Sequence, residues 1–206
     1  MSIIGLRLKH ELEGKNRLTI NPVEQKRNIA TTRSFEVNYT EYEMIKERIV
    51  TFAVSCAEKL RAQHSCCNAL LITLRTNKHK SNTVQVKRST VVNLPYPTNS
   101  NIELANFAIE GLKKIFTPNL SYKKAGVITM GLTPENKRQL SFFENSNPKH
   151  QKLMQAIDTV NKKVGSHKVK LASQDLKKTW KMKQNHLSPK YTTKLSDIIE
   201  VNAKEI

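Results

Sequence analysis

Between residues 31 and 131 the chain alternates between short β-prone segments and longer segments with a helical repeat of apolar positions. Strands are predicted for residues 31–37, 68–76, 83–94 and 122–131, which are rich in valine, isoleucine, leucine, threonine and aromatic side chains. The first predicted helix has apolar residues at Ile45, Ile49, Phe52, Cys56 and Leu60. The second has them at Ala105, Ala108, Ile109, Leu112 and Ile115. Capping boxes are expected before them, at Thr40/Glu43 and Ser100/Glu103.

This order of elements, β-α-β-β-α-β, is typical of a split βαβ domain of the α+β class. It predicts a four-stranded sheet with both helices on one face and the other face open. We place this domain at residues 31–133.

The flanking regions have a different character. Residues 1–30 contain one short apolar helix and a polar stretch, and we interpret them as the remnant of a preceding domain and its linker. Residues 134–147 form a polar linker, and residues 148–206 form an extension. In the extension, a helix is expected to begin at Pro148 and end at Gly165, and a short strand is expected at residues 169–172.

The charge of the chain indicates an anionic partner. It has 35 Lys and Arg against 17 Asp and Glu, a formal net charge of +18, and such an excess attracts polyanions, nucleic acid first among them. No apolar run of about 18 residues and no signal peptide is present, so we expect a soluble intracellular protein with no membrane partner.

Residues suited to catalysis or metal binding are sparse. The three aspartates all lie at or beyond Asp158, so a carboxylate cluster for two-metal nucleotidyl transfer is not expected. The six glycines form no phosphate-binding loop. His64, Cys66 and Cys67 lie close together, but the second ligand pair that zinc usually needs is missing. We therefore predict no catalytic residues, no metal and no cofactor.

Basic and hydroxyl side chains recur along the predicted strands, where they could contact a phosphate backbone on the open face of the sheet without reading its sequence. Few aromatic residues accompany them, which argues against base stacking. A solvated basic face without a partner is the alternative. The candidate DNA-binding residues are Arg33, Ser34, Arg75, Thr76, Lys78, Lys80, Lys87, Arg88, Lys123 and Lys124.

A pair of phenylalanines lies in the polar linker, within Gln139-Leu140-Ser141-Phe142-Phe143. An aromatic pair in such a context is often a docking peptide that places a few apolar anchors in a partner's pocket. Packing of Phe142 and Phe143 back onto the domain is the alternative.

Taken together, these segments resemble the C-terminal portion of the catalytic subunits of the bacterial DNA polymerase V family, which are Y-family translesion polymerases. Gly5–Leu8 and Leu12–Gly14 resemble the end of the thumb, and residues 139–143 resemble the clamp-binding motif, with Phe142 where leucine is common. The little finger is matched by Thr32–Phe35, Ala57–Arg61 and Tyr122–Val127, and the family's tail by Ala156–Asp158, Trp180–Lys183 and Ser188–Thr193.

The resemblance implies a little finger that grips duplex DNA near a primer-template end. It also implies a tether to the sliding clamp, in which Gln139 hydrogen-bonds at the rim while Leu140, Phe142 and Phe143 fill apolar subsites. Further expected partners are the polymerase V accessory subunit and the recombinase filament, in the cytoplasm at the nucleoid, during the SOS response to damaged DNA. The family's catalytic palm and fingers have no counterpart here, so no enzymatic activity is expected of this chain alone.

Two alternatives remain open at this stage. The chain could be a free-standing, non-catalytic regulator that competes for the clamp. It could also be a generic nucleic-acid-binding protein.

Overall fold

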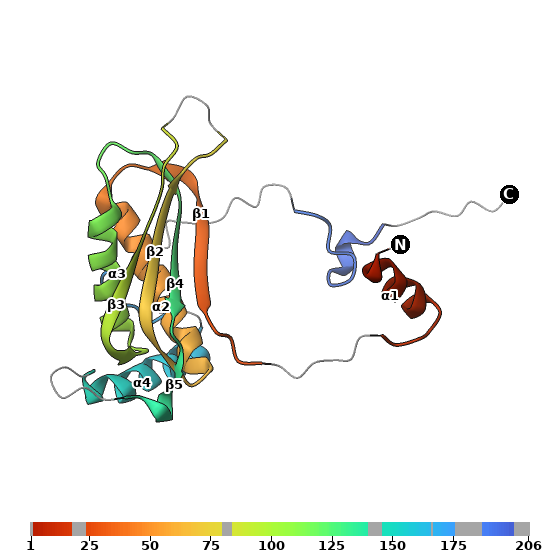
Figure 1. Ribbon diagram of the computed structural model, residues 1–206. Helices are drawn as coiled ribbons and strands as arrows, with labels where there is room; N and C mark the ends of the chain where they lie inside the picture. Colours follow the sequence, from red (N-terminus) through yellow and green to blue (C-terminus); the bar gives the residue numbers. More distant parts are fainter. Residues whose placement is uncertain are drawn as a thin grey trace.

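The computed structural model describes residues 2–17, 24–79, 84–139, 146–165, 167–175 and 187–199 (Figure 1). In chain order the elements are α1 (Ile3–Leu12), β1 (Ile29–Tyr39), α2 (Tyr42–Ala62), β2 (Ser65–Thr76), β3 (Lys87–Thr98), α3 (Asn101–Ile115), β4 (Tyr122–Met130), β5 (Thr133–Pro134), η1 (Glu135–Lys137), α4 (Pro148–Val164) and η2 (Leu195–Asp197).

The four long strands form one antiparallel sheet in the order β1-β4-β2-β3, and the two-residue strand β5 pairs with the start of β2. Helices α2 and α3 lie against the same face of this sheet (Figure 1). The predicted α+β class and the β-α-β-β-α-β order are therefore confirmed. The opposite face carries no helix among the described residues.

The core lies between the two helices and the sheet. All five apolar positions of the first predicted helix are fully buried on α2, and Leu70, Ile72 and Leu74 of β2 face them from the sheet. Each such side chain contributes about 1.5 to 3 kcal/mol when it is removed from water. The helical repeat in the sequence therefore identified the face of α2 that holds the domain together.

Neither predicted capping box forms. The N-cap of α2 is Glu41 rather than Thr40, and no side chain caps the helix. Ser100 is the N-cap of α3, but its hydroxyl lies 3.1 Å from Nδ1 of His150, and Glu103 turns toward other partners. The capping pattern located both helix starts approximately, while the side chains serve contacts that local sequence does not reveal.

Strand β3 begins at Lys87 rather than residue 83 and continues through Pro95 and Pro97 to Thr98. Proline lacks the N–H that a central strand must donate, and β3 tolerates it because it lies at the edge of the sheet.

Helix α4 begins and ends as predicted, with Pro148 in the first turn and Gly165 as C-cap at a φ of +123°. The short strand expected at residues 169–172 is not present. Instead, the Asn161 side chain pairs with both backbone groups of Val169, at 2.8 and 3.1 Å, and the segment turns back on α4. The backbone of Val169 is thus paired with a side chain of α4 and not with another strand.

Helix α1 has no buried residue, and its apolar side chains are largely exposed. Within the described ranges, no helix has both the length and the apolarity required to cross a bilayer.

Candidate nucleic-acid face and docked C-terminal arm

Four of the predicted DNA-binding residues lie side by side across the open face of the sheet. Ser34 pairs with Lys124, Lys124 with Arg75, and Arg75 with Lys87, so one residue from each long strand joins a transverse line. We call Ser34, Lys124, Arg75 and Lys87 the cationic row. Its side chains point away from α2 and α3, because the alternate residues Leu74 and Ala125 are buried beneath those helices.

Three of the four residues in this row are cations on adjacent strands. Directly paired residues have their Cβ atoms about 4.5 to 5.5 Å apart, and like charges at that separation oppose pairing. No carboxylate of the described residues lies within 4.0 Å of these three cations. The sheet therefore holds a concentration of positive charge that an external polyanion would relieve.

The side-chain chemistry of the open face changes along the strands. The next row consists of Thr32, Gly126, Thr73 and Ser89, which offers small hydroxyl side chains. The row beyond it consists of Ala30, Ile128, Leu71 and Val91, which is apolar. Hydroxyls beside cations are common phosphate contacts, so the cationic and hydroxyl rows together suit a phosphate backbone.

The other predicted residues are not all brought to this face. Arg33 pairs with Ala125, and Arg88 pairs with Leu74, so both lie on the helix side of the sheet. Thr76 is buried, and its hydroxyl accepts a 2.8 Å hydrogen bond from the Val86 backbone. Sequence alone could not assign these residues to a face, because the register decides it.

Of the three further predicted lysines, two have no partner in the strand register and one lies outside the described residues. The ammonium of Lys123 donates to the Glu36 carbonyl at 3.1 Å, and Lys78 is exposed in the turn after β2. Lys80 lies outside the described ranges.

Of the predicted clamp-binding peptide, the structure describes Gln139, which is exposed; Leu140, Ser141, Phe142 and Phe143 lie outside the described residues. The flanks of the peptide are attached to the domain. Before it, Thr133 and Pro134 pair with β2. After it, the Ser146 hydroxyl donates to the Glu103 carboxylate at 2.8 Å.

The cysteines are buried thiols. Cys66 and Cys67 open β2, and Cys56 lies in the core, whereas His64 is exposed at a positive φ of 54°. Burial raises the pKa of the Cys66 thiol to about 11 and also raises the pKa values of Cys67 and Cys56. No group of three or more potential metal ligands gathers in the part of the chain that the structure describes.

Residues 146–165 and 167–175, here called the C-terminal arm, dock against the domain. The arm supplies two histidines and two aspartates, and each one faces a charged residue of α2 or α3. The pairs are His150 with Glu103 at 3.0 Å, Asp158 with Arg61 at 2.7 Å, His167 with Glu58 at 3.6 Å, and Asp175 with Arg48 at 2.8 Å.

Two apolar side chains add to these polar contacts. Met154 of α4 is completely buried, and its sulfur lies 3.4 Å from the Asn101 backbone nitrogen. Leu171 packs against a small cluster that includes Val50 and Val54 of α2. The arm therefore buries part of the helical layer on the side opposite the sheet.

Glu103 anchors the beginning of the arm. It is nearly buried on α3, and its carboxylate accepts hydrogen bonds from the hydroxyls of Thr98 and Ser146 and from the Asn147 backbone. A buried carboxylate must be satisfied by hydrogen bonds or charge, and His150 completes its surroundings.

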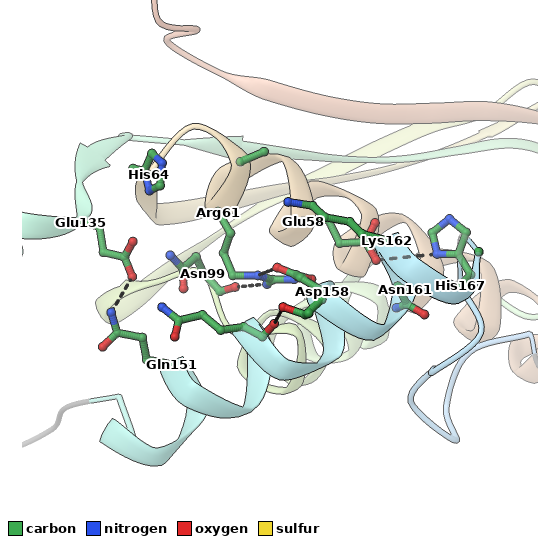
Figure 2. Close-up of a pocket in the computed structure, with 14 residues that line it drawn as sticks. Glu58, Arg61, His64, Asn99, Glu135, Gln151, Asp158, Asn161, Lys162 and His167 are labelled. Carbon is green, nitrogen blue, oxygen red and sulfur yellow. Dashed lines mark hydrogen bonds and ion pairs between the residues drawn. The ribbon is translucent and has the colours of Figure 1, made fainter.

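A polar cleft of about 640 Å³ remains between α2 and α4. In Figure 2 the Arg61–Asp158 pair lies in the middle of the cleft, with Glu135 and Gln151 toward one end and Glu58 and His167 toward the other. Burial raises the pKa of Glu58, while the neighbouring His167 and Arg61 oppose this effect. The lining mixes both signs of charge, so it favours no single class of ligand.

Comparison with known proteins finds a family match for the domain and another for the region that follows it. Residues 26–142 match the impB/mucB/samB family C-terminal domain, and residues 151–201 match a domain of unknown function, DUF4113. The first match covers β1 to β5, including the whole candidate nucleic-acid face. The second begins within α4.

Whole-chain relatives agree with this assignment. The chain is 32% identical to protein UmuC of Salmonella typhimurium strain LT2 over 97% of its length, and 30% and 28% identical to proteins ImpB and SamB of Salmonella typhimurium over 96%. It spans about half the length of these curated relatives, at 48%, 47% and 47%. The chain therefore belongs to the impB/mucB/samB family, whose C-terminal domain it carries.

Proposed function

We propose that this chain is the DNA-gripping and clamp-binding part of an error-prone translesion DNA polymerase that acts in DNA repair and SOS mutagenesis. Membership of the UmuC-containing family supports the polymerase context. In this proposal catalysis belongs to the portion of such enzymes that the chain does not span.

The cationic row is the observation that carries the DNA part of the proposal. Lys124, Arg75 and Lys87 lie on three adjacent strands of a face that no described helix covers, and hydroxyl side chains lie beside them. Contacts of this kind hold a duplex by its phosphates and are independent of base sequence. Affinity should then fall steeply with salt, because each neutralised phosphate releases counterions.

Lys87 and Arg88 provide a matched pair for testing this idea. They are neighbours in sequence and both exposed, yet they point to opposite faces of β3. In fluorescence anisotropy with a primer-template duplex, Lys87→Ala should weaken binding several-fold and flatten the salt slope by about 0.9, the value for one lost phosphate contact. Arg88→Ala should change neither quantity.

Two results would count against backbone gripping at this face. One is an equal loss of affinity in both variants, which would indicate a general effect of charge. The other is a loss restricted to certain base sequences.

The clamp part rests on residues 139–143, through the resemblance and the exposed position of Gln139. In isothermal titration calorimetry with the sliding clamp, the triple variant Gln139→Ala, Leu140→Ala, Phe143→Ala should lose binding. The same variant should keep its DNA affinity, since the cationic row is intact. Clamp binding retained by the variant would refute the assignment.

A further inference from the structure

Helix α4 carries an exposed apolar stripe on a side that does not face the domain. Leu153, Val160 and Val164 are 44%, 41% and 64% exposed, and Ala156 between them is also exposed. Residues three or four apart lie one above another on a helix, so these four form one continuous line. Eleven steps of about 1.5 Å separate Leu153 from Val164, so the line is about 16 Å long.

The docked side of α4 is a different side. Met154 is buried there, and Asp158 is paired with Arg61. The exposed stripe is therefore not the surface that attaches the arm to the domain.

Lysines border the stripe. Lys152 and Lys163 lie along one edge of it by helical position, Lys149, four residues before Leu153, lies at its N-terminal end, and all three are exposed. An apolar line with a basic edge is complementary to an apolar groove with carboxylates on its rim. A nucleic acid would use the lysines but gain little from the apolar line, so the chemistry favours a protein.

The stripe is too small to hold a protein partner alone. A stable interface buries about 800 Å² on each side, and four aliphatic side chains, partly covered already, supply a small fraction of that. The partner must therefore also bind another part of the chain, and that part must lie near α4.

The position of α4 identifies such a part. The helix begins five residues after Phe143, and Gln151 in its first turns donates a 3.2 Å hydrogen bond to Glu135, just before Gln139. Both described flanks of the proposed clamp-binding peptide are thus fixed beside the N-terminal end of the stripe.

We propose that this stripe is a second contact for the protein that binds residues 139–143, with Leu153, Val160 and Val164 entering an acid-rimmed apolar groove of that protein. The inference rests on the proposed function, because it takes the sliding clamp as that protein. It adds a surface outside the peptide and gives the docked arm a role in binding: α4 is held rigidly so that the stripe and the peptide engage together.

The test uses the full chain and the sliding clamp in isothermal titration calorimetry. Leu153→Asp and Val160→Asp should each weaken clamp binding by about fivefold to tenfold, as expected for an apolar contact near the centre of an interface. Gln155→Asp introduces the same charge on the cleft side of α4, away from both the stripe and its lysine edge, and should change the affinity less than about twofold. Urea denaturation and DNA anisotropy establish that each variant is folded and still binds DNA.

The outcomes separate this inference from the proposed function. If the stripe variants bind the clamp like the wild type while the peptide variant does not, the second contact is refuted and the tether stands. If Gln155→Asp weakens binding as much as Val160→Asp, the effect is one of charge and the stripe is again refuted. A loss of DNA affinity with clamp affinity retained would assign the stripe to DNA. A wild-type chain that does not bind the clamp would overturn both proposals.

Discussion

The guanidinium of Arg61 donates two hydrogen bonds of 2.7 Å to the carboxylate of Asp158, across 97 residues of sequence. The same guanidinium also donates to the Asn99 carbonyl at 2.6 Å and to the Asn101 side chain at 2.9 Å. It therefore joins α2, the start of α3 and α4. The docking of the C-terminal arm depends on the planar fork that arginine provides.

We expect Arg61→Lys to be almost as damaging as Arg61→Ala, because lysine cannot make the paired contact. With side chains 9% and 23% exposed, loss of this pair should cost about 2 to 3 kcal/mol of unfolding free energy. Urea denaturation measures the cost, and hydrogen exchange should show earlier opening of α4. A lysine variant with wild-type stability would contradict a bidentate role.

The sequence predicted the domain well wherever the repeat of apolar residues coincides with the buried face of an element. The repeat Ile45, Ile49, Phe52, Cys56 and Leu60 identified the buried face of α2 because packing against a sheet requires that spacing. Pro148 and Gly165 bounded α4 for equally local reasons, the fixed φ of proline and the positive φ of glycine.

The faces of the strands were harder to predict. Arg33 and Arg88 looked equivalent to Arg75 and Lys87, but a side-chain period of two means that a shift of one residue exchanges the faces. Only the register separates the cationic row from the arginines on the helix side.

The contacts of the arm gave no local signal. Glu103 was assigned to a capping box, and no role was predicted for His150. In the structure His150 Nδ1 lies 3.0 Å from the Glu103 carboxylate. Charged pairs at long sequence separation leave no periodic pattern, so the ionic contacts of the arm with Arg61 and Arg48 required the structure.

Gly126 lies in the middle of the open face, and a methyl group there would meet Thr32. A Cβ atom at this position would lie 2.4 Å from Cγ2 of Thr32 and 3.1 Å from Oγ1 of Thr73. Gly126→Ala should therefore cost about 1 to 3 kcal/mol through overpacking. Thr32→Ala removes the nearest atom, so the double variant should recover part of that loss in urea denaturation. Additive costs would show that the clash with the Thr32 methyl group is not the cause.

The buried thiols should react slowly. Burial raises the pKa of Cys66 from 9.0 to about 11, which reduces the thiolate fraction at pH 8 roughly 100-fold, and only the thiolate is nucleophilic. In a thiol-labelling assay at pH 8 the native chain should react far more slowly than the denatured chain, which exposes all three cysteines.

The same shift predicts how stability depends on pH. A thiol with a raised pKa in the folded state contributes stability that is complete below about pH 9, the unfolded value, and is lost as the pH rises through about 11. Cys66→Ala removes that titration, so its unfolding free energy should decline less than that of the wild type between pH 9 and 11. Rapid labelling of one native cysteine at pH 8 would contradict the buried arrangement.

Arg48 and Asp175 form the second arginine–aspartate pair between the domain and the arm. Their side chains are only 1% and 10% exposed, and the contact is 2.8 Å. The Arg48 guanidinium also lies 5.5 Å from the centre of the Tyr39 ring. Removing one member of a buried pair takes the nearest opposite charge from the other, and Glu47, at 3.8 Å from Arg48, compensates only in part. Arg48→Met or Asp175→Leu alone should therefore cost about 3 kcal/mol. The double variant removes both charges and should be more stable than either single variant in urea denaturation. If the two single costs simply add in the double variant, the pair does not act as a unit, and the arm is held at this end by packing of Leu171 instead.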